Sequence, residues 1–254
     1  MGIFGFNQKD GPGISKDAPE KNRFFNFFDI FFTRIWKIVT LNIIYLIFCI
    51  PIVTIGPATC GLAYVLRKFA NDEHAEVFAD FFDAFKKNFK QGIIIGILEL
   101  LFVALLIFDF QFFSNPENIA AIPWFAYAVP LLYIAAGVYI SMRFYMYTII
   151  VTFKVNIRQI LKNSFLFAVI GVLRNLCLLA LCFVVIILPL INLNGLILPI
   201  YAAGMILIIP AFLGLVISYA TYPLLKKHMI DPYVDNENKK EDGEEPVFSD
   251  VIKK

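Results

Sequence analysis

Long runs of apolar residues dominate the chain. The first, residues 38–70, reads IVTLNIIYLIFCIPIVTIGPATCGLAYVLRKFA and is interrupted near its middle by Pro51 and by Gly56 and Pro57. A run of this length that carries charge only near its end is typical of a segment inside a lipid bilayer. Proline lacks a backbone N–H donor and pushes the preceding residue out of helical geometry. We therefore predict two helical pieces joined at a break.

Four more apolar runs follow, and each is long enough to cross a bilayer. With the two pieces of the first run, the expected hydrophobic helices are 41–55, 58–69, 92–113, 124–150, 166–191 and 196–223. A short loop at 114–118 and a turn at 192–195 pair the long helices, and Trp124 lies where an interfacial aromatic residue is expected. The sequence thus predicts an all-α polytopic membrane protein with about six hydrophobic helices in three hairpins, the first short or re-entrant.

Three segments that each precede an apolar run combine an apolar stripe with a polar face. They are residues 23–37 and 71–91, both with a phenylalanine stripe, and the milder, basic segment 154–165. Helices with this pattern lie flat in the headgroup region of a membrane. For residues 23–37, whose stripe includes Phe24, Phe28 and Phe31, the alternative is a helix that packs on a cytosolic partner.

A weak repeat relates two of these units. A shift of 75 residues places Lys87 on Lys162 and Glu99 on Arg174. Both of the hydrophobic helices concerned would then enter the membrane in the same direction. Parallel repeats of this kind occur in transport proteins.

Basic residues indicate which loops face the cytoplasm. The 254-residue chain is 59% hydrophobic and only 17% charged, and the loops at 114–123 and 192–195 contain no lysine or arginine. Short basic loops stay in the cytoplasm, so these two loops face outward and the C-terminus is cytoplasmic. We expect a polar arm (1–22), one membrane domain (23–226) and a charged tail (227–254) that is disordered from about Asp235.

The side of the N-terminus depends on the first apolar run. Both termini share the cytoplasmic side only if residues 38–70 enter the membrane and return. The second piece, 58–69, rises about 18 Å at 1.5 Å per residue, whereas the hydrocarbon core is about 30 Å thick. We therefore expect a re-entrant hairpin or a short crossing shielded by other helices. The alternative is one kinked span, with an outward N-terminus and five crossings.

The strings Pro51-Ile52-Val53-Thr54-Ile55-Gly56-Pro57-Ala58-Thr59 and Tyr64-Val65-Leu66-Arg67 resemble the signature of the YesL-like integral membrane proteins of bacteria. The match is dense over about the first hundred residues and rests on hydropathy and length beyond them. The resemblance implies a plasma-membrane location and a gene context beside sugar-uptake transporters and polysaccharide-degradation genes. It implies no mechanism and no catalytic residues.

Four charged residues lie inside predicted spans, where an isolated charge is costly. Glu99, Arg143 and Arg174 should share a depth on the inner side, whereas Asp109 lies near the outer end of its span. We predict an intramembrane cluster in which Glu99 pairs with Arg143, Arg174 or both. Its role is either structural or that of a substrate or ion site, and the arginines could instead reach the headgroups.

The sequence favours no enzyme. It contains no Walker loop, no HExxH, no Gly-x-Ser-x-Gly and no dinucleotide glycine pattern. The four cysteines lie inside apolar segments without Cys-x-x-Cys spacing, so we expect small buried side chains, no metal site and no cofactor. A net charge of +2 does not point to nucleic acid.

Two functions remain open. One is an accessory or subunit of carbohydrate uptake, with sugar-transporter subunits and membrane lipid as partners. The other is a structural or regulatory membrane partner that transports nothing. A polar cavity reaching both faces would favour the first function, and a solid core with an exposed groove would favour the second.

Overall fold

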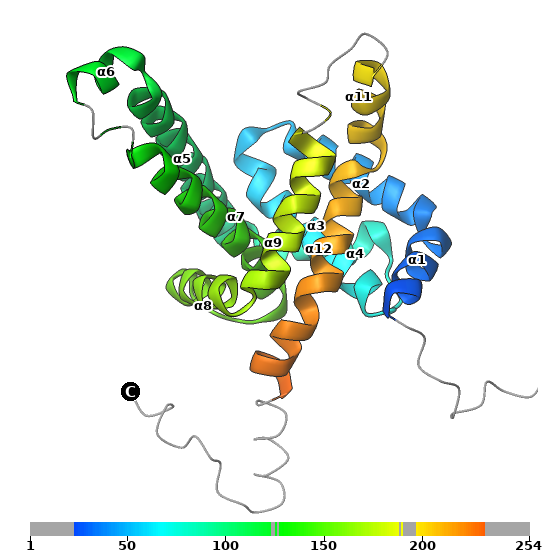
Figure 1. The fold of residues 1–254 in the computed structure, drawn as a ribbon. Coiled ribbons are helices and arrows are strands. Elements are labelled where there is room, and N and C mark those ends of the chain that lie inside the picture. Colours follow the sequence, from blue (N-terminus) through cyan, green and yellow to red (C-terminus); the bar gives the residue numbers. More distant parts are fainter. Residues whose placement is uncertain (1–22, 123–124, 126, 188, 190–196, 232–254) are drawn as a thin grey trace, which may run out of the picture.

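The computed structural model describes residues 23–122, 125, 127–187, 189 and 197–231, and Figure 1 shows them as a bundle of helices joined by short connections. The predicted polar arm, Trp124, the turn at 192–195 and residues 232–254 of the tail lie outside this part. The helices are α1 (Arg23–Thr33), α2 (Ile35–Cys49), α3 (Ile55–Ala70), α4 (Val77–Lys87), α5 (Phe89–Ser114), α6 (Pro116–Ala121), α7 (Ala128–Thr152), α8 (Ile157–Ile170), α9 (Val172–Cys182), α11 (Ile197–Leu207) and α12 (Ile209–Leu225). The all-α polytopic prediction is confirmed.

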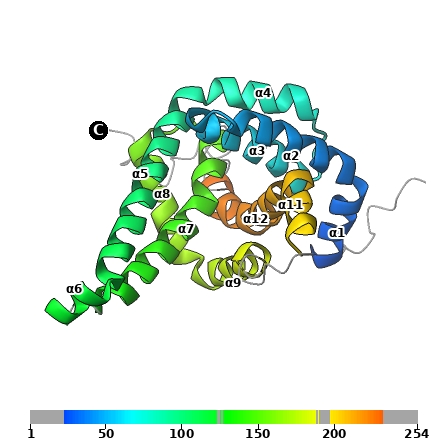
Figure 2. The same ribbon diagram turned by 90° about the horizontal axis from the view of Figure 1, so that it is seen from above.

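Helix α3 is the centre of the bundle. Ten of its 16 residues are buried, and α2, α4, α5, α7 and α12 pack around it (Figure 2). At about 24 Å it is too short to cross a hydrocarbon core alone. Protein neighbours rather than lipid surround it, and a short helix can lie at membrane depth under that condition.

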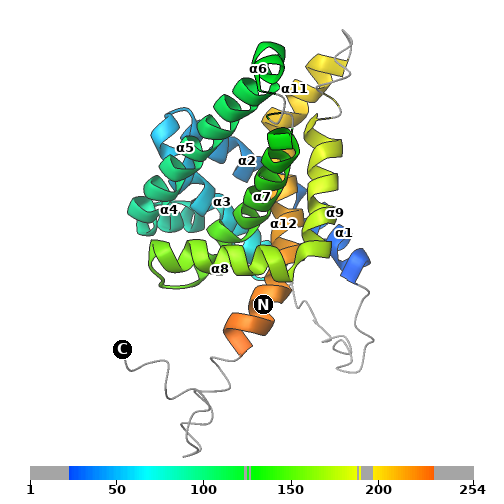
Figure 3. The ribbon, with the colours of Figure 1, turned by 60° about the vertical axis from the view of Figure 1, so that its left-hand side comes forward.

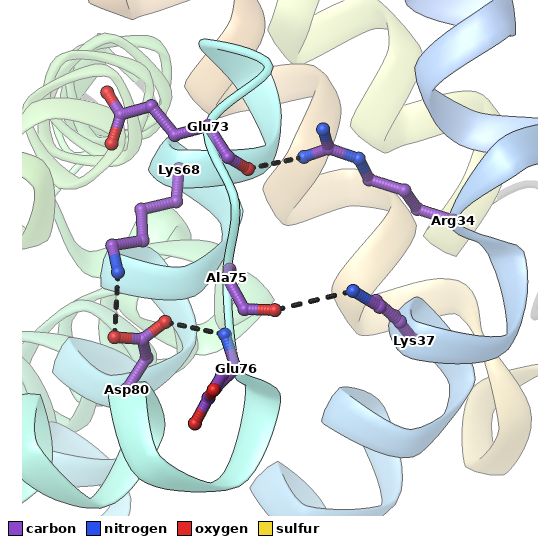
Figure 4. A network of polar contacts seen from close by, with 7 residues as sticks. All are labelled: Arg34, Lys37, Lys68, Glu73, Ala75, Glu76 and Asp80. Atoms are coloured by element: carbon purple, nitrogen blue, oxygen red, sulfur yellow. Dashed lines mark hydrogen bonds and ion pairs between the residues drawn. The ribbon is translucent and has the colours of Figure 1, made fainter. Parts of the chain in front are cut away.

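Helices α2 and α3 form the expected hairpin. Just before α2, Arg34 pairs with Asp72, and its Nη1 donates to the carbonyl of Glu73 at 2.9 Å. Lys37 reaches the carbonyl of Ala75 at 3.5 Å (Figure 4). Because these partners follow the end of α3, the chain has returned to the level at which it entered α2.

The break between the two helices of this hairpin includes fewer residues than the sequence indicated. Pro51 lies in it, between α2 and a 3₁₀ turn at Ile52–Thr54. Gly56 and Pro57 instead belong to the first turn of α3, where a missing backbone N–H leaves no helix hydrogen bond unmade. The threonine of the turn, Thr54, donates its hydroxyl to the carbonyl of Phe48 at 2.6 Å and so ties the end of α2 to the break.

The connection from α3 to α4 is closely tied down. The N–H groups of Asp72 and Glu73 donate to the carbonyls of Phe69 and Lys68, and Asp72 has a φ of 56°, which together make a Schellman motif. Asp80 accepts a hydrogen bond from the Lys68 ammonium and another from the Glu76 N–H, both at 2.8 Å (Figure 4).

Close contacts between glycines let α3 touch α5 backbone to backbone. A Cβ on Gly56 would lie 2.0 Å from the carbonyl oxygen of Gly92, and one on Gly92 would lie 2.8 Å from the nitrogen of Pro57. A Cβ on Gly96 would lie 3.2 Å from the Cα of Gly56. Gly92 and Gly96 form a Gly-x-x-x-Gly pair, a pattern typical of close helix packing in membranes. The role of Gly56 is thus close contact rather than helix breaking.

Several predicted elements are bent or broken. The predicted helix 23–37 ends at Thr33, and α2 leaves α1 at 70°. The predicted span 166–191 starts inside α8, which lies across the base of the bundle (Figure 3) and meets α9 at 93°. The hydroxyl of Tyr145 reaches Asn175 at 2.9 Å beside this bend. Among the described residues, three helices are long and apolar enough to cross a membrane, or five if each bent pair is one span.

The phenylalanine stripe of 71–91 has a different role from the predicted one. Its helix, α4, begins only at Val77, and Phe81 is fully buried against Gly61 of α3. Phe82 and Phe85 stack edge-on with Phe48 of α2. Most of this stripe therefore faces protein, not headgroups. On α1 the exposed rings are Phe24, Phe25, Phe28 and Phe32.

Gly56→Ala tests the α3–α5 contact. The added methyl would overlap the Gly92 carbonyl, so α3 and α5 must separate, and we expect a loss of about 1–3 kcal/mol in unfolding free energy. Thermal unfolding of the purified protein in detergent, monitored by size-exclusion chromatography, should show the loss of stability as a lower midpoint temperature. The control is Gly137→Ala, where no atom lies within 4 Å of the new methyl. Equal midpoints for the two variants would contradict the contact.

Candidate functional site

An ion pair joins two long helices inside the apolar part of the bundle. Arg143 of α7 donates through Nε to Glu99 Oε1 on α5. Tyr147 donates its hydroxyl to the other carboxylate oxygen, Oε2, at 2.7 Å. Arg143 and Tyr147 are four residues apart and so share a face of α7. Both oxygens of Glu99 therefore have a donor.

The face of α5 that carries Glu99 also carries the glycine contact. Gly92, Gly96 and Glu99 are spaced i, i+4 and i+7, which places them on one side of the helix. Because that side is held against α3 through the glycines, Glu99 points inward toward α7. The glycine contact and the ion pair thus depend on the same rotation of α5.

Arg174 does not join the pair. It is the third residue of α9, and one of its guanidinium nitrogens, Nη1, is buried without a hydrogen-bond partner. Glu99 is the eleventh residue of α5, so Glu99 lies about 15 Å along its helix and Arg174 about 3 Å along its own. The 75-residue shift aligns Glu99 with Arg174 and would make α9 begin at residue 164. In the structure α9 begins eight residues later, at Val172. Asp109, nearer the outer end of α5, forms no ion pair within the described residues.

The ion pair lies at the edge of a cavity of about 860 Å³. Helices α3, α7, α9 and α12 form most of its wall, and Arg143, Tyr147 and Thr59 contribute to the lining. The rest of the wall is largely apolar and includes Leu62, Leu66, Leu176, Leu179, Phe183, Leu213 and Ile217. Such a space suits a largely apolar molecule.

Three polar side chains of the cavity wall are engaged within the protein, and the wall also carries the hydroxyls of Tyr45, Tyr133, Thr148 and Ser218. Thr59 donates its hydroxyl to the carbonyl of Ile55 at 2.7 Å, and Tyr147 donates to Glu99. Arg143 is held through its Nε, which donates to the same carboxylate. Within the described residues, no three His, Cys, Asp or Glu side chains come together as metal ligands.

Asn42 is a second polar site that the sequence prediction missed. It is fully buried on α2, and its amide donates to the carbonyls of Met205 and Ile206 at 3.3 and 2.8 Å. Its Oδ1 accepts the N–H of Ala211 at 2.9 Å. These groups flank the break between α11 and α12, so one side chain satisfies both ends of a broken helix. An asparagine inside an apolar run is the sequence signal for it.

Comparisons with known proteins give a family-level likeness without an activity. Residues 38–110, from α2 into α5, match a family described as "Protein of unknown function, DUF624". The chain is 28% identical over 188 residues to "Uncharacterized protein YesV" of Bacillus subtilis (strain 168). The aligned region covers 72% of this chain and 84% of that protein. No solved structure matches the chain. The family match spans the hairpin, the glycine contact and Glu99.

Glu99→Gln and Arg143→Gln test the ion pair. Each single change leaves one charge unpaired in apolar surroundings, so each should lower stability by about 3 kcal/mol. The double variant removes both charges and should lose less than the sum of the two. Thermal midpoints in detergent measure all three, with Asp109→Asn as the control. Additive losses would show that the two side chains do not interact.

Proposed function

We propose that the chain is an accessory membrane protein that acts beside carbohydrate-uptake machinery, catalyses no reaction and does not itself form the sugar path. The observation that carries the last of these points is the composition of the cavity beside Glu99 and Arg143. A sugar presents many hydroxyl groups, and burying them without hydrogen bonds is costly. The cavity offers mainly hydrocarbon, and two of its hydroxyls, those of Thr59 and Tyr147, already have acceptors.

The α5–α7 hairpin is the part best placed to contact a partner in the membrane. It extends away from the rest of the bundle (Figures 1 and 2). Only 6% of the apolar window of α5 is buried, and exposed side chains such as Leu101, Leu105 and Phe108 cover its outer turns. In a membrane this surface must face lipid or another protein's helices, and a transporter subunit is the partner we propose.

The carbohydrate setting comes from the resemblance to YesL-like proteins, carried by residues 51–59 and 64–67. That narrower assignment is part of the proposal and rests on the resemblance alone, because the family that residues 38–110 match is described as of unknown function. We also propose a cytoplasmic C-terminus. Arg23 donates to the carbonyl of Tyr219 at 3.2 Å, and Tyr219 donates to the carbonyl of Arg23 at 2.7 Å, so the start of α1 lies beside the last turns of α12.

A second candidate is a structural or regulatory partner of a membrane protein unrelated to sugar uptake. The same exposed hairpin favours it, and so does the small number of intramembrane charges. The two candidates differ in the identity of the partner rather than in the surface used.

Cross-linking in native membranes separates the candidates. A photoreactive residue replacing Leu105 on the exposed face of α5 should capture a subunit of a sugar transporter, identified by mass spectrometry. The same residue replacing Ile95, which is buried, is the control and should capture nothing. Deleting the gene should slow uptake of at least one oligosaccharide. Unchanged uptake of every sugar, with capture of an unrelated membrane protein, would favour the second candidate.

A further inference from the structure

A second cavity, of about 960 Å³, lies where the α4–α5 junction meets the connection from α7 to α8. Four lysines contribute to its wall: Lys86, Lys87 and Lys90 from the first junction and Lys154 from the second. The side-chain amide of Gln91 donates to the carbonyl of Val155 at 2.9 Å and ties the two segments together. The wall is thus held by a contact across 64 residues of sequence.

The positive charge of this cavity has no counterpart in its lining. None of the residues that line it is acidic. Within the described part of the chain, none of the four lysines forms an ion pair, whereas Lys68 and Arg34 nearby are paired with Asp80 and Asp72. A fifth cation, Arg67, donates through Nη1 to Thr152 of the same wall at 2.9 Å. A cavity of this kind attracts an anion.

The apolar part of the lining indicates that the anionic group belongs to a molecule that also carries hydrocarbon. Phe85, Phe89, Ile150, Val151 and Phe153 share the wall with the lysines. The cavity lies at the first turn of α5 and the last turns of α7, two of the helices that can cross a membrane. A ligand that places charge against the lysines and hydrocarbon against these side chains is a lipid at the membrane surface. Basic pockets beside transmembrane helices bind anionic headgroups in this way.

We propose that this cavity binds the phosphate of an anionic phospholipid headgroup, with the lysines as its partners and the acyl chains along the neighbouring apolar wall. The site is separate from the cavity beside Glu99 and Arg143. It is also independent of the proposed link to carbohydrate uptake. In the proposed orientation, it takes its lipid from the inner leaflet.

Native mass spectrometry of the purified protein in detergent, titrated with phosphatidylglycerol or phosphatidylcholine, tests the site. The wild-type protein should retain the anionic lipid in preference to the zwitterionic one. Replacing Lys87, Lys90 and Lys154 with glutamine should weaken phosphatidylglycerol binding about tenfold or more, without lowering the thermal midpoint. The matched control replaces Lys162, Lys226 and Lys227, which are exposed lysines outside the cavity, and should change binding less than twofold.

The outcomes separate a built site from general attraction. Equal losses in the two triple variants, or no loss in either, would overturn the proposal. Glycerol phosphate and inorganic phosphate serve as soluble competitors in a second arm. If either displaces phosphatidylglycerol at an equal concentration, the site takes a free phosphate compound and the lipid assignment is wrong. If neither does, the acyl chains contribute and the assignment stands.

Discussion

The backbone contact between Gly56 of α3 and Gly92 of α5 constrains the rest of the molecule. Where two helix backbones touch without side chains between them, the contact allows only one rotation of each helix about its axis and one position along it. Here that contact fixes α5 so that Glu99 faces α7. It also holds α3, a helix too short to span a bilayer by itself, inside a ring of neighbouring helices.

The polar groups of the interior follow from this arrangement. Inside a bilayer no water is present to form hydrogen bonds with a free donor or acceptor, so each polar side chain there needs a hydrogen-bond partner within the protein. Glu99 has Arg143 and Tyr147, and Asn42 supplies the hydrogen bonds that the broken α11–α12 helix lacks. At the end of the α2–α3 hairpin, Arg34 and Asp80 do the same for the exposed connection to α4. The contacts of Glu99 and Asn42 cross between helices, so they specify the packing as well as satisfying the groups.

Hydropathy was sufficient to predict the helical membrane class, the ends of α5 and α7 to within a few residues, and the break at Pro51. Periodicity could not locate the bend at Gly171 or the break at Ile208, because apolar residues continue through both and only tertiary contacts distinguish them. Depth counted from span ends left Arg143 and Arg174 as alternative partners of Glu99, and the structure shows the pair with Arg143. Asn42 and the Gly92–Gly96 pair left visible signals in the sequence, but the partners of both lie on other helices.

The claim on which the topology depends is that residues 38–70 enter the membrane and return. It is tested most directly by labelling single cysteines, at Ser15 and at Ser249, in a protein whose four native cysteines are replaced. A membrane-impermeant thiol reagent applied to intact cells should label neither position, and should label both once the membrane is made permeable. A third cysteine at Glu117, in α6 of the segment predicted to face outward, should be labelled in intact cells. Labelling of Ser15→Cys but not Ser249→Cys in intact cells would mean that the first apolar run crosses once, and would contradict the hairpin.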